Sequence, residues 1–200
     1  MGSDATKDRI LRATAIEVAR HGFKGASLRG VAQRADIKAA SIFHYFPAGK
    51  DELTRAMLAY IMEIIATRMT PTIQASSELP ATDLIVQCSA LLWDFFAEHP
   101  EYAGALMREA FEPDEAVAAV VREHALRVVK LATTYFRAAQ EAGTLAAFDV
   151  RRFLMRISSY AITFHAAPSM RQYILGARVS MREERDAFLR HVRGEIAGPR

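Results

Sequence analysis

Hydrophobic residues recur along this chain at spacings of three and four, which is the period of an α-helix. In the segment over 6–21, for example, Ile10, Leu11 and Val18 fall on one helical face, and a longer segment over 50–69 shows the same pattern. We find no strand-like alternation of apolar and polar residues, no internal repeat and no low-complexity tract. The pattern therefore predicts an all-α fold.

Proline and glycine divide this pattern into about nine helices. Gly22, Pro47 and Gly143 are examples of such stop signals, because proline lacks a backbone N–H and glycine readily adopts the left-handed conformation that ends a helix. The segment TPTIQASSELP, residues 70–80, is predicted to interrupt the helical pattern. Besides the two segments above, the predicted helices cover 28–35, 38–46, 82–98, 100–110, 114–142, 149–166 and 182–196.

Two short helices near the N-terminus are predicted to form a helix-turn-helix unit over about residues 27–46. Ser27 is a natural N-cap for the helix over 28–35, because its hydroxyl can accept a hydrogen bond from a free backbone N–H. Asp36 follows, and Asp is one of the few non-glycine residues that tolerates a left-handed turn. A turn of about three residues leads to the helix over 38–46, which is the layout that places a helix in a DNA major groove.

The charge of the chain is concentrated at its N-terminal end. The 200 residues have a formal net charge of +3, yet residues 1–55 alone carry a net +4 and residues 56–200 a net −1. A basic head on a nearly neutral body is typical of nucleic-acid binding by the head. We therefore expect a DNA-binding domain over 1–49 and a second domain over 50–200.

Other classes of protein find little support in the sequence. The longest apolar run, residues 84–93, is shorter than the roughly 18 residues that a membrane helix needs, and the N-terminus has no apolar secretion signal. Cys88 is the single cysteine, so an intramolecular disulfide is excluded. Zinc-helix and di-iron motifs are absent, and Asp51 stands where a phosphate-binding loop would need Ser or Thr. We expect a cytoplasmic protein with no catalytic residues, cofactor, metal or membrane partner.

The segment RILRATAIEVARHGFKGASLRGVAQRADIKAASIFHYFPAGKDEL carries an ordered set of residues: Ile10, Leu11, Gly22, Phe23, Ser27, Val31, Ala32, Ala35, Ile37, Ser41, Ile42, His44, Tyr45, Phe46, Lys50 and Leu53. With this spacing, residues 6–55 resemble the N-terminal DNA-binding domain of the TetR family of bacterial transcriptional regulators. The resemblance implies a three-helix, helix-turn-helix head followed by a helical domain for effector binding and dimerisation.

The helix over 38–46 is the expected DNA-reading element. It has only two turns, so Ile42, Phe46 and either Phe43 or Tyr45 are expected to anchor it on its neighbours. Its small residues allow close approach to base edges, and its polar side chains can bind bases or phosphates. With the resemblance, the expected DNA-binding residues are Ser27, Arg29, Lys38, Ala39, Ala40, Ser41, His44, Tyr45 and Lys50.

The head also departs from the family pattern. Asp36 stands where many members have Gly, Lys38 where Ser often caps the recognition helix, and Phe43 where Tyr is usual. Glu17 stands at a position that is often apolar, and Gly30 lies inside the second predicted helix. These departures alter the contact set, so the operator sequence cannot be read from the resemblance.

The resemblance assigns effector binding and dimerisation to the rest of the chain. The candidate pocket residues are Ile61, Ile65, Met69, Leu92, Trp93, Phe96, Tyr102, Met107, Phe111, His124, Val128 and Tyr135. The candidate dimer residues, on the helices over 149–166 and 182–196, are Phe153, Ile157, Tyr160, Phe164, Phe188, Leu189 and Val192. Both sets are also typical of a helical core, and core packing stays open as their alternative role.

The resemblance therefore implies a homodimeric regulator, usually a repressor in this family, that binds a pseudo-palindromic double-stranded operator. A small, largely apolar effector would shift the population of two states by moving the helix that begins at Lys50, and would thereby release the DNA. Two alternatives stay open: a DNA-binding protein without effector control, and a small helical enzyme.

Overall fold

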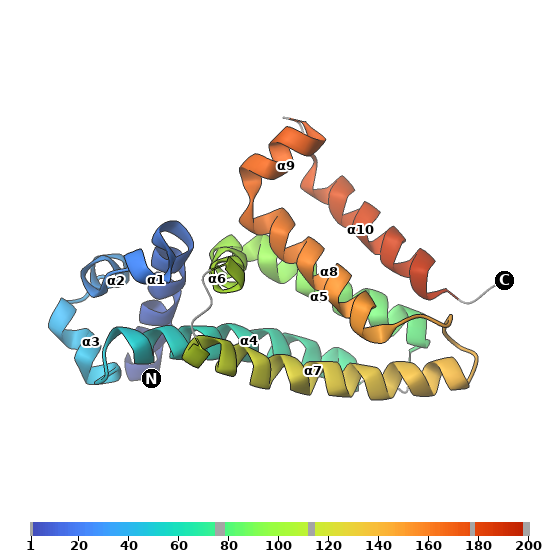
Figure 1. Cartoon of the computed structure of the whole chain (residues 1–200), viewed down its shortest axis with the longest axis horizontal. Helices are drawn as coiled ribbons and strands as arrows, with labels where there is room; N and C mark the ends of the chain where they lie inside the picture. The colour runs from blue at the N-terminus through green and yellow to red at the C-terminus, as the bar shows by residue number, and fades with distance from the viewer. Residues whose placement is uncertain (1, 75–78, 112–114, 177–178, 198–200) are drawn as a thin grey trace. The chain divides into compact units, whose positions relative to one another are not determined.

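The computed structural model describes residues 2–74, 79–111, 115–176 and 179–197, and in these ranges it contains ten α-helices and no β-strand (Figure 1). The all-α prediction is confirmed. The helices are α1 (Gly2–Gly25), α2 (Leu28–Ala35), α3 (Ala39–Tyr45), α4 (Lys50–Gln74), α5 (Ala81–Glu98), α6 (Pro100–Phe111), α7 (Glu115–Glu141), α8 (Val150–Ala166), α9 (Pro168–Leu175) and α10 (Met181–Ile196).

Three helices differ from the sequence-based prediction by more than one residue at an end. The first is longer at both ends, and it contains a kink at Gly22, whose φ of 71° and ψ of 172° are non-helical and are readily adopted only by glycine. α4 continues through Pro71 to Gln74, because a proline this close to the helix end removes little of the hydrogen-bond ladder. α9 was not predicted; Pro168 stands at its start, where proline favours a helix because its backbone N–H is not needed there.

The residues form two compact units, which are described separately. The first unit comprises Met1–Ile64 and His99–His124, and the second comprises Ile65–Glu98 and Ala125–Arg200. The expected functional boundary after residue 49 stays a prediction. Within the described residues, no helix is long and apolar enough to cross a membrane.

In the first unit, α1 makes its most extensive contacts with α6 and also packs on α2. Its buried face includes Ile10 and Val18, which have no exposed surface. α6 comes unusually close at Gly104, where a Cβ would lie 2.8 Å from the Cβ of Ala19. An ion pair between Arg12 and Glu101, 2.9 Å from Nε to Oε1, joins the same two helices.

The second unit is built around α5, which packs against α8 and α10. Trp93 is buried at its centre, with its ring centroid 4.7 Å from that of Phe164 and 5.0 Å from that of Phe188. At the edge of this core, Arg185 donates two hydrogen bonds to Asp94, of 2.6 and 2.8 Å. Because these contacts bring α8 and α10 onto α5, they fix the surfaces that this unit leaves exposed.

Candidate DNA-binding surface

The turn between α2 and α3 has the predicted local structure. The Ser27 hydroxyl oxygen accepts a 3.0 Å hydrogen bond from the Gly30 backbone N–H, so it caps α2. Asp36 adopts the left-handed conformation, with φ 53° and ψ 54°. Its backbone N–H and that of Ile37 donate to carbonyls in the last turn of α2, which closes the helix end. The turn therefore sets the direction in which α3 leaves α2.

Two side chains anchor α3. Ile42 and Phe46 are buried, as expected, and the Phe46 backbone N–H donates to the Ile42 carbonyl at 2.8 Å to end the helix. Of the two alternatives for a third anchor, Tyr45 is half-buried whereas Phe43 is 51% exposed. The His44 ring meets the Tyr45 ring edge-on, with centroids 5.2 Å apart. The anchored face therefore carries Ile42, Phe46 and part of Tyr45.

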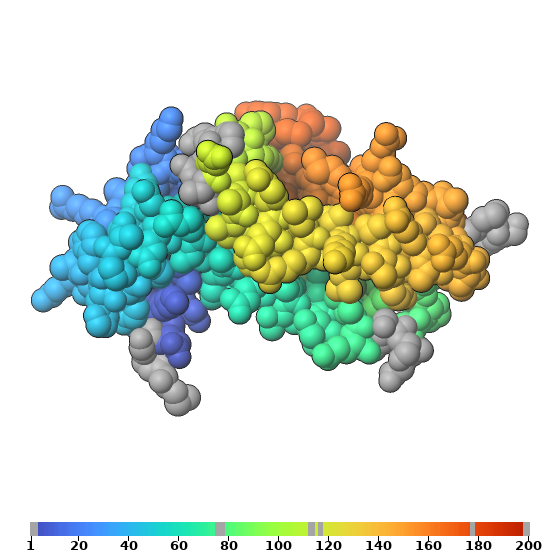
Figure 2. Space-filling view, turned by 60° about the horizontal axis from the view of Figure 1, so that its bottom comes forward, coloured from blue at the N-terminus to red at the C-terminus, as the bar shows by residue number. Residues whose placement is uncertain are grey.

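The other face of α3 lies at the surface. The segment from α2 to the start of α4 forms a continuous, blue-to-cyan surface in the space-filling view (Figure 2). Ser41 is half-buried, and its backbone N–H donates to the Lys38 carbonyl at 2.9 Å. The expected DNA-binding residues that are exposed are Ser27, Arg29, Lys38, Ala39, Ala40 and His44. Small and polar side chains are thus brought together on one short helix and its flanks.

Lys50 has a contact that the sequence did not predict. It is half-buried at the start of α4, and its ammonium donates a 2.9 Å hydrogen bond to the backbone carbonyl of Lys24, near the end of α1. An ammonium has three N–H donors, so this bond leaves capacity for a phosphate oxygen. The helix start is also capped by Glu52, whose carboxylate accepts from the Ala48 backbone N–H at 2.8 Å. Lys50 therefore has a structural role whether or not it contacts DNA.

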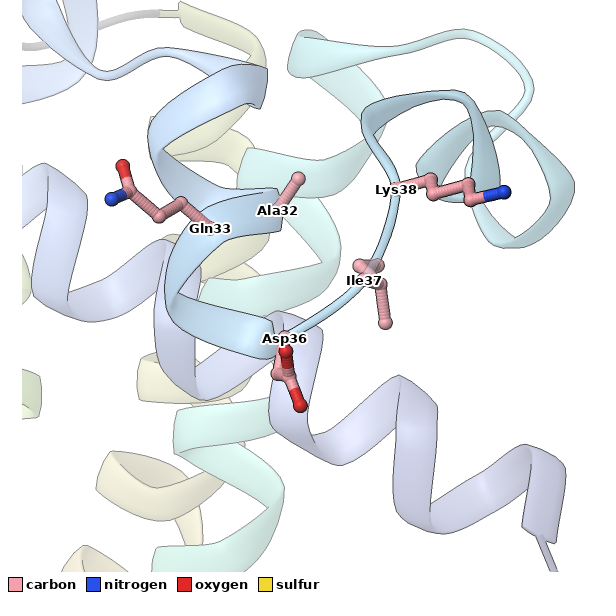
Figure 3. A pocket seen from close by; sticks show the side chains of 5 residues that line it. All are labelled: Ala32, Gln33, Asp36, Ile37 and Lys38. Atoms are coloured by element: carbon pink, nitrogen blue, oxygen red, sulfur yellow. The ribbon is translucent and has the colours of Figure 1, made fainter.

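An open surface hollow of about 370 Å³ lies at the turn between α2 and α3 (Figure 3). It is lined by Ala32, Gln33, Asp36, Ile37 and Lys38. Gln33 and Lys38 extend in opposite directions from it, so the hollow has an amide on one side and an ammonium on the other. Gln33 was not among the expected DNA-binding residues; its exposed position at the end of α2 is the only signal for it.

The candidate pocket residues fall in both units. In the first unit, Tyr102 is buried, and Met107 and His124 are half-buried, but Phe111 is 76% exposed. The His124 Nδ1–H donates to the Val120 carbonyl at 2.9 Å, so this ring nitrogen already has a partner.

In the second unit, Trp93 and Phe96 belong to the core, and Ile65, Met69 and Tyr135 are half-buried. Their role in effector binding stays a prediction. A second open hollow, of about 260 Å³, is lined by Val86, Asp186, Leu189, Arg190 and Arg193, and it contains none of the candidate pocket residues.

Most of the candidate dimer residues pack inside their own chain, because α8 and α10 both cover α5. Tyr160 is 44% exposed and Leu189 is half-buried, so both keep accessible surface. The side chains that are already buried in the single chain are Phe153, Ile157, Phe164, Phe188 and Val192. For these five residues, the burial agrees with the alternative role, which is packing in the core of the single chain. Dimerisation itself stays a prediction.

Comparison with known proteins agrees with the geometry of the head. A family model described as "Bacterial regulatory proteins, tetR family" matches residues 10–57, which include α2, α3 and the start of α4. No curated protein matches the chain.

Solved structures with the same fold cover nearly the whole chain. A bacterial regulatory protein in the tetR family from Rhodococcus RHA1 is 18% identical with a TM-score of 0.75, covering 98% of each chain. The ketosteroid transcriptional regulator KstR2 of Mycobacterium tuberculosis is 17% identical with a TM-score of 0.72, covering 96% of this chain and 95% of its own. AibR, solved in complex with isovaleryl coenzyme A and operator DNA, is 15% identical with a TM-score of 0.71, covering 92% and 96%.

The head combines a capped α2, a left-handed turn and an anchored α3, and the family match covers these same elements. Residues 10–57 therefore match the tetR family of bacterial regulatory proteins, and the chain has the all-α fold of solved regulators described as members of that family.

Proposed function

We propose that this chain is a homodimeric transcriptional repressor that reads operator DNA with α3 and releases it when a small, largely apolar molecule binds its helical body. The observation that supports this most strongly is the construction of α3. Ile42 and Phe46 hold it on the head, and its small and polar residues are left at the surface. A helix built in this way can enter a major groove without losing its own packing.

We assign different tasks to the residues of this surface. Ala39 and Ala40 have no long side chain, so base edges and thymine methyl groups can approach α3 closely. Ser41 is placed to hydrogen-bond to a base. The remaining assigned residues bind backbone phosphates: Ser27, Arg29, Lys38, His44, Tyr45 and Lys50. Phosphate contacts position the helix, and base contacts select the sequence.

One short recognition helix reads too few bases to select a site alone, so a two-fold dimer is needed to combine two half-sites. Tyr160 and Leu189 are the predicted dimer residues that keep accessible surface. We therefore propose that the exposed sides of α8 and α10, rather than their buried stripes, meet the second copy.

The effector class is inferred from residue types and from neighbours. The candidate pocket residues are mainly aromatic and Met side chains, which suit an adaptable apolar site. One structural neighbour is described as a ketosteroid transcriptional regulator, and another was solved in complex with isovaleryl coenzyme A. We propose an apolar or acyl effector that favours a DNA-free state. By thermodynamic linkage, DNA must weaken effector binding by the same factor that the effector weakens DNA binding.

The test begins with selection of preferred duplexes from a randomised library by the wild-type chain, followed by affinity measurements on one selected and one unrelated duplex. Ser41→Ala is expected to change the preference between duplexes by about fivefold or more, because a base contact carries sequence information. Lys38→Ala is expected to weaken binding to both duplexes equally and to reduce the slope of log affinity against log salt by about 1.

Lys130→Ala on α7 is the matched control, since Lys130 is exposed and its loss removes the same charge outside the proposed surface. If the wild-type chain enriches no duplex, or if Lys38→Ala and Lys130→Ala have equal effects, the assigned surface is wrong.

A further inference from the structure

A buried carboxylate lies between the first two helices of the head. Glu17 in α1 is only 5% exposed, although charged residues are rarely buried unless they are paired. Its partner is Arg34 in the last turn of α2, with 2.8 Å between the guanidinium Nε and the carboxylate Oε2. The pair therefore joins α1 to the element that leads into the DNA-reading helix.

Gly30 provides the space for this carboxylate. A Cβ built at Gly30 would lie 2.1 Å from Oε1 and 2.6 Å from Cδ of Glu17, which is far inside contact distance. Glycine lowers the stability of a helix, and α2 has only eight residues. The space that the Glu17 carboxylate needs explains why a glycine stands there. The two departures from the family pattern, at positions 17 and 30, are thus one feature.

This feature is suited to fix the orientation of α2. Apolar contacts tolerate sliding, whereas a buried carboxylate that is paired with a guanidinium keeps one geometry, because any shift leaves the buried charge of Glu17 without its partner. The last residue of α2 is followed directly by the turn at Asp36, which directs α3. A rotation of α2 on α1 would therefore displace the recognition helix.

We propose that Glu17 and Arg34 are a positioning pair for the DNA-reading helix, and that Gly30 is the notch that admits the carboxylate. This inference rests on the proposed function, because it concerns how accurately α3 meets DNA. It predicts that the pair affects discrimination between DNA sequences and not merely the stability of the fold.

Two variants separate positioning from packing. Glu17→Gln keeps the shape of the side chain in the notch but removes its charge. The double variant Glu17→Ala/Gly30→Ala moves a methyl group into the vacated notch and restores helix propensity in α2, but has no ion pair. Gly194→Ala, where a Cβ would have nothing within 4 Å, is the control for glycine replacement in a helix outside the head.

The experiment compares the affinity of each variant for the duplex that the wild-type chain selects with its affinity for an unrelated duplex. Amide hydrogen exchange of α2 and α3 is measured in parallel without DNA, and urea unfolding gives the stability. For Glu17→Gln the affinity ratio is expected to fall about tenfold, the effect of losing roughly one base contact, with faster exchange in α2 and α3. The double variant is expected to regain stability while its affinity ratio stays low.

If the double variant regains both its stability and its affinity ratio between the two duplexes, the pair only helps to pack the head. That result would overturn the proposal. An unchanged ratio in Glu17→Gln would overturn it as well. If the wild-type chain selects no duplex at all, the proposed function fails instead, and the exchange data still report whether the pair orders α2.

Discussion

His165 illustrates how much a single buried residue of the second unit depends on its surroundings. It is almost fully buried on α8, with its ring centroid 4.8 Å from that of Trp93, and its Nε2 has no hydrogen-bond partner among the described residues. Burial, followed by the positive charge of Arg171, lowers the pKa of His165 to about 4, whereas Asp94 acts in the opposite direction. The imidazole is therefore neutral in the folded protein at pH 7.

Acidification is therefore expected to destabilise the fold through His165. The unfolded chain binds a proton near the ordinary histidine pKa of 6.5, but the folded chain does so only near 4, so the free energy of unfolding falls as the pH drops through this interval. Between pH 7.5 and pH 5.0 the loss is about 2 kcal/mol. Urea unfolding at both pH values measures it. His165→Phe should reduce the loss, and an equal pH dependence in that variant would contradict the assignment.

At the scale of helices, the contact between α1 and α6 shows how a glycine sets a packing distance. At Gly104 the two helices approach so closely that a Cβ would lie 2.8 Å from the Cβ of Ala19. Neither atom is at the end of a flexible side chain, so the backbone must move to accept a larger residue. The Arg12–Glu101 ion pair and a 3.4 Å hydrogen bond from Arg108 Nε to the Ala19 carbonyl oppose that movement.

Gly104→Ala is expected to lower the free energy of unfolding by about 1 to 3 kcal/mol, because overpacking outweighs the gain in helix propensity. The double variant Ala19→Gly/Gly104→Ala should recover most of that loss, since Ala19→Gly removes the methyl group that a Cβ at position 104 would meet. Gly194→Ala serves as the control and should be neutral or stabilising. Urea unfolding of the wild type and the three variants measures the difference, and a Gly104→Ala variant as stable as the wild type would contradict the close approach.

The helices also show what local sequence can and cannot predict. The bounds of α2 were predicted because Ser27 and Asp36 carry the cap and the turn in their own side chains and backbone. α9 was missed because a proline ends one helix and starts another equally well. The Glu17–Gly30 feature joins residues on different helices, so no local pattern reveals it.

The apolar stripes of the second unit show a further limit. A stripe of apolar residues at helical spacing gives the same sequence pattern whether it packs against the core of its own chain or against a second copy of the chain. Only the structure shows that Phe153 and Val192 have no exposed surface in the single chain, whereas Tyr160 does. Sequence periodicity therefore predicted the helices of this unit other than α9, but not the partner of each face.

At the scale of the whole molecule, a basic head is joined to a nearly neutral body. Residues 1–55 carry a net +4 against −1 for the remainder, so attraction to phosphates is concentrated in the part that carries α3. A symmetric dimer would present two such heads to DNA, and its half-sites would lie about one helical turn, ~34 to 36 Å, apart.

The most direct test of the central claim is a hydroxyl-radical footprint of the wild-type chain on its selected duplex. We expect two protected regions, related by two-fold symmetry and centred about one helical turn apart. Addition of an effector from a panel of apolar and acyl compounds should remove both regions together. A single protected region, protection that spreads evenly along the duplex, or no protection at all would contradict a dimeric regulator that reads DNA through α3.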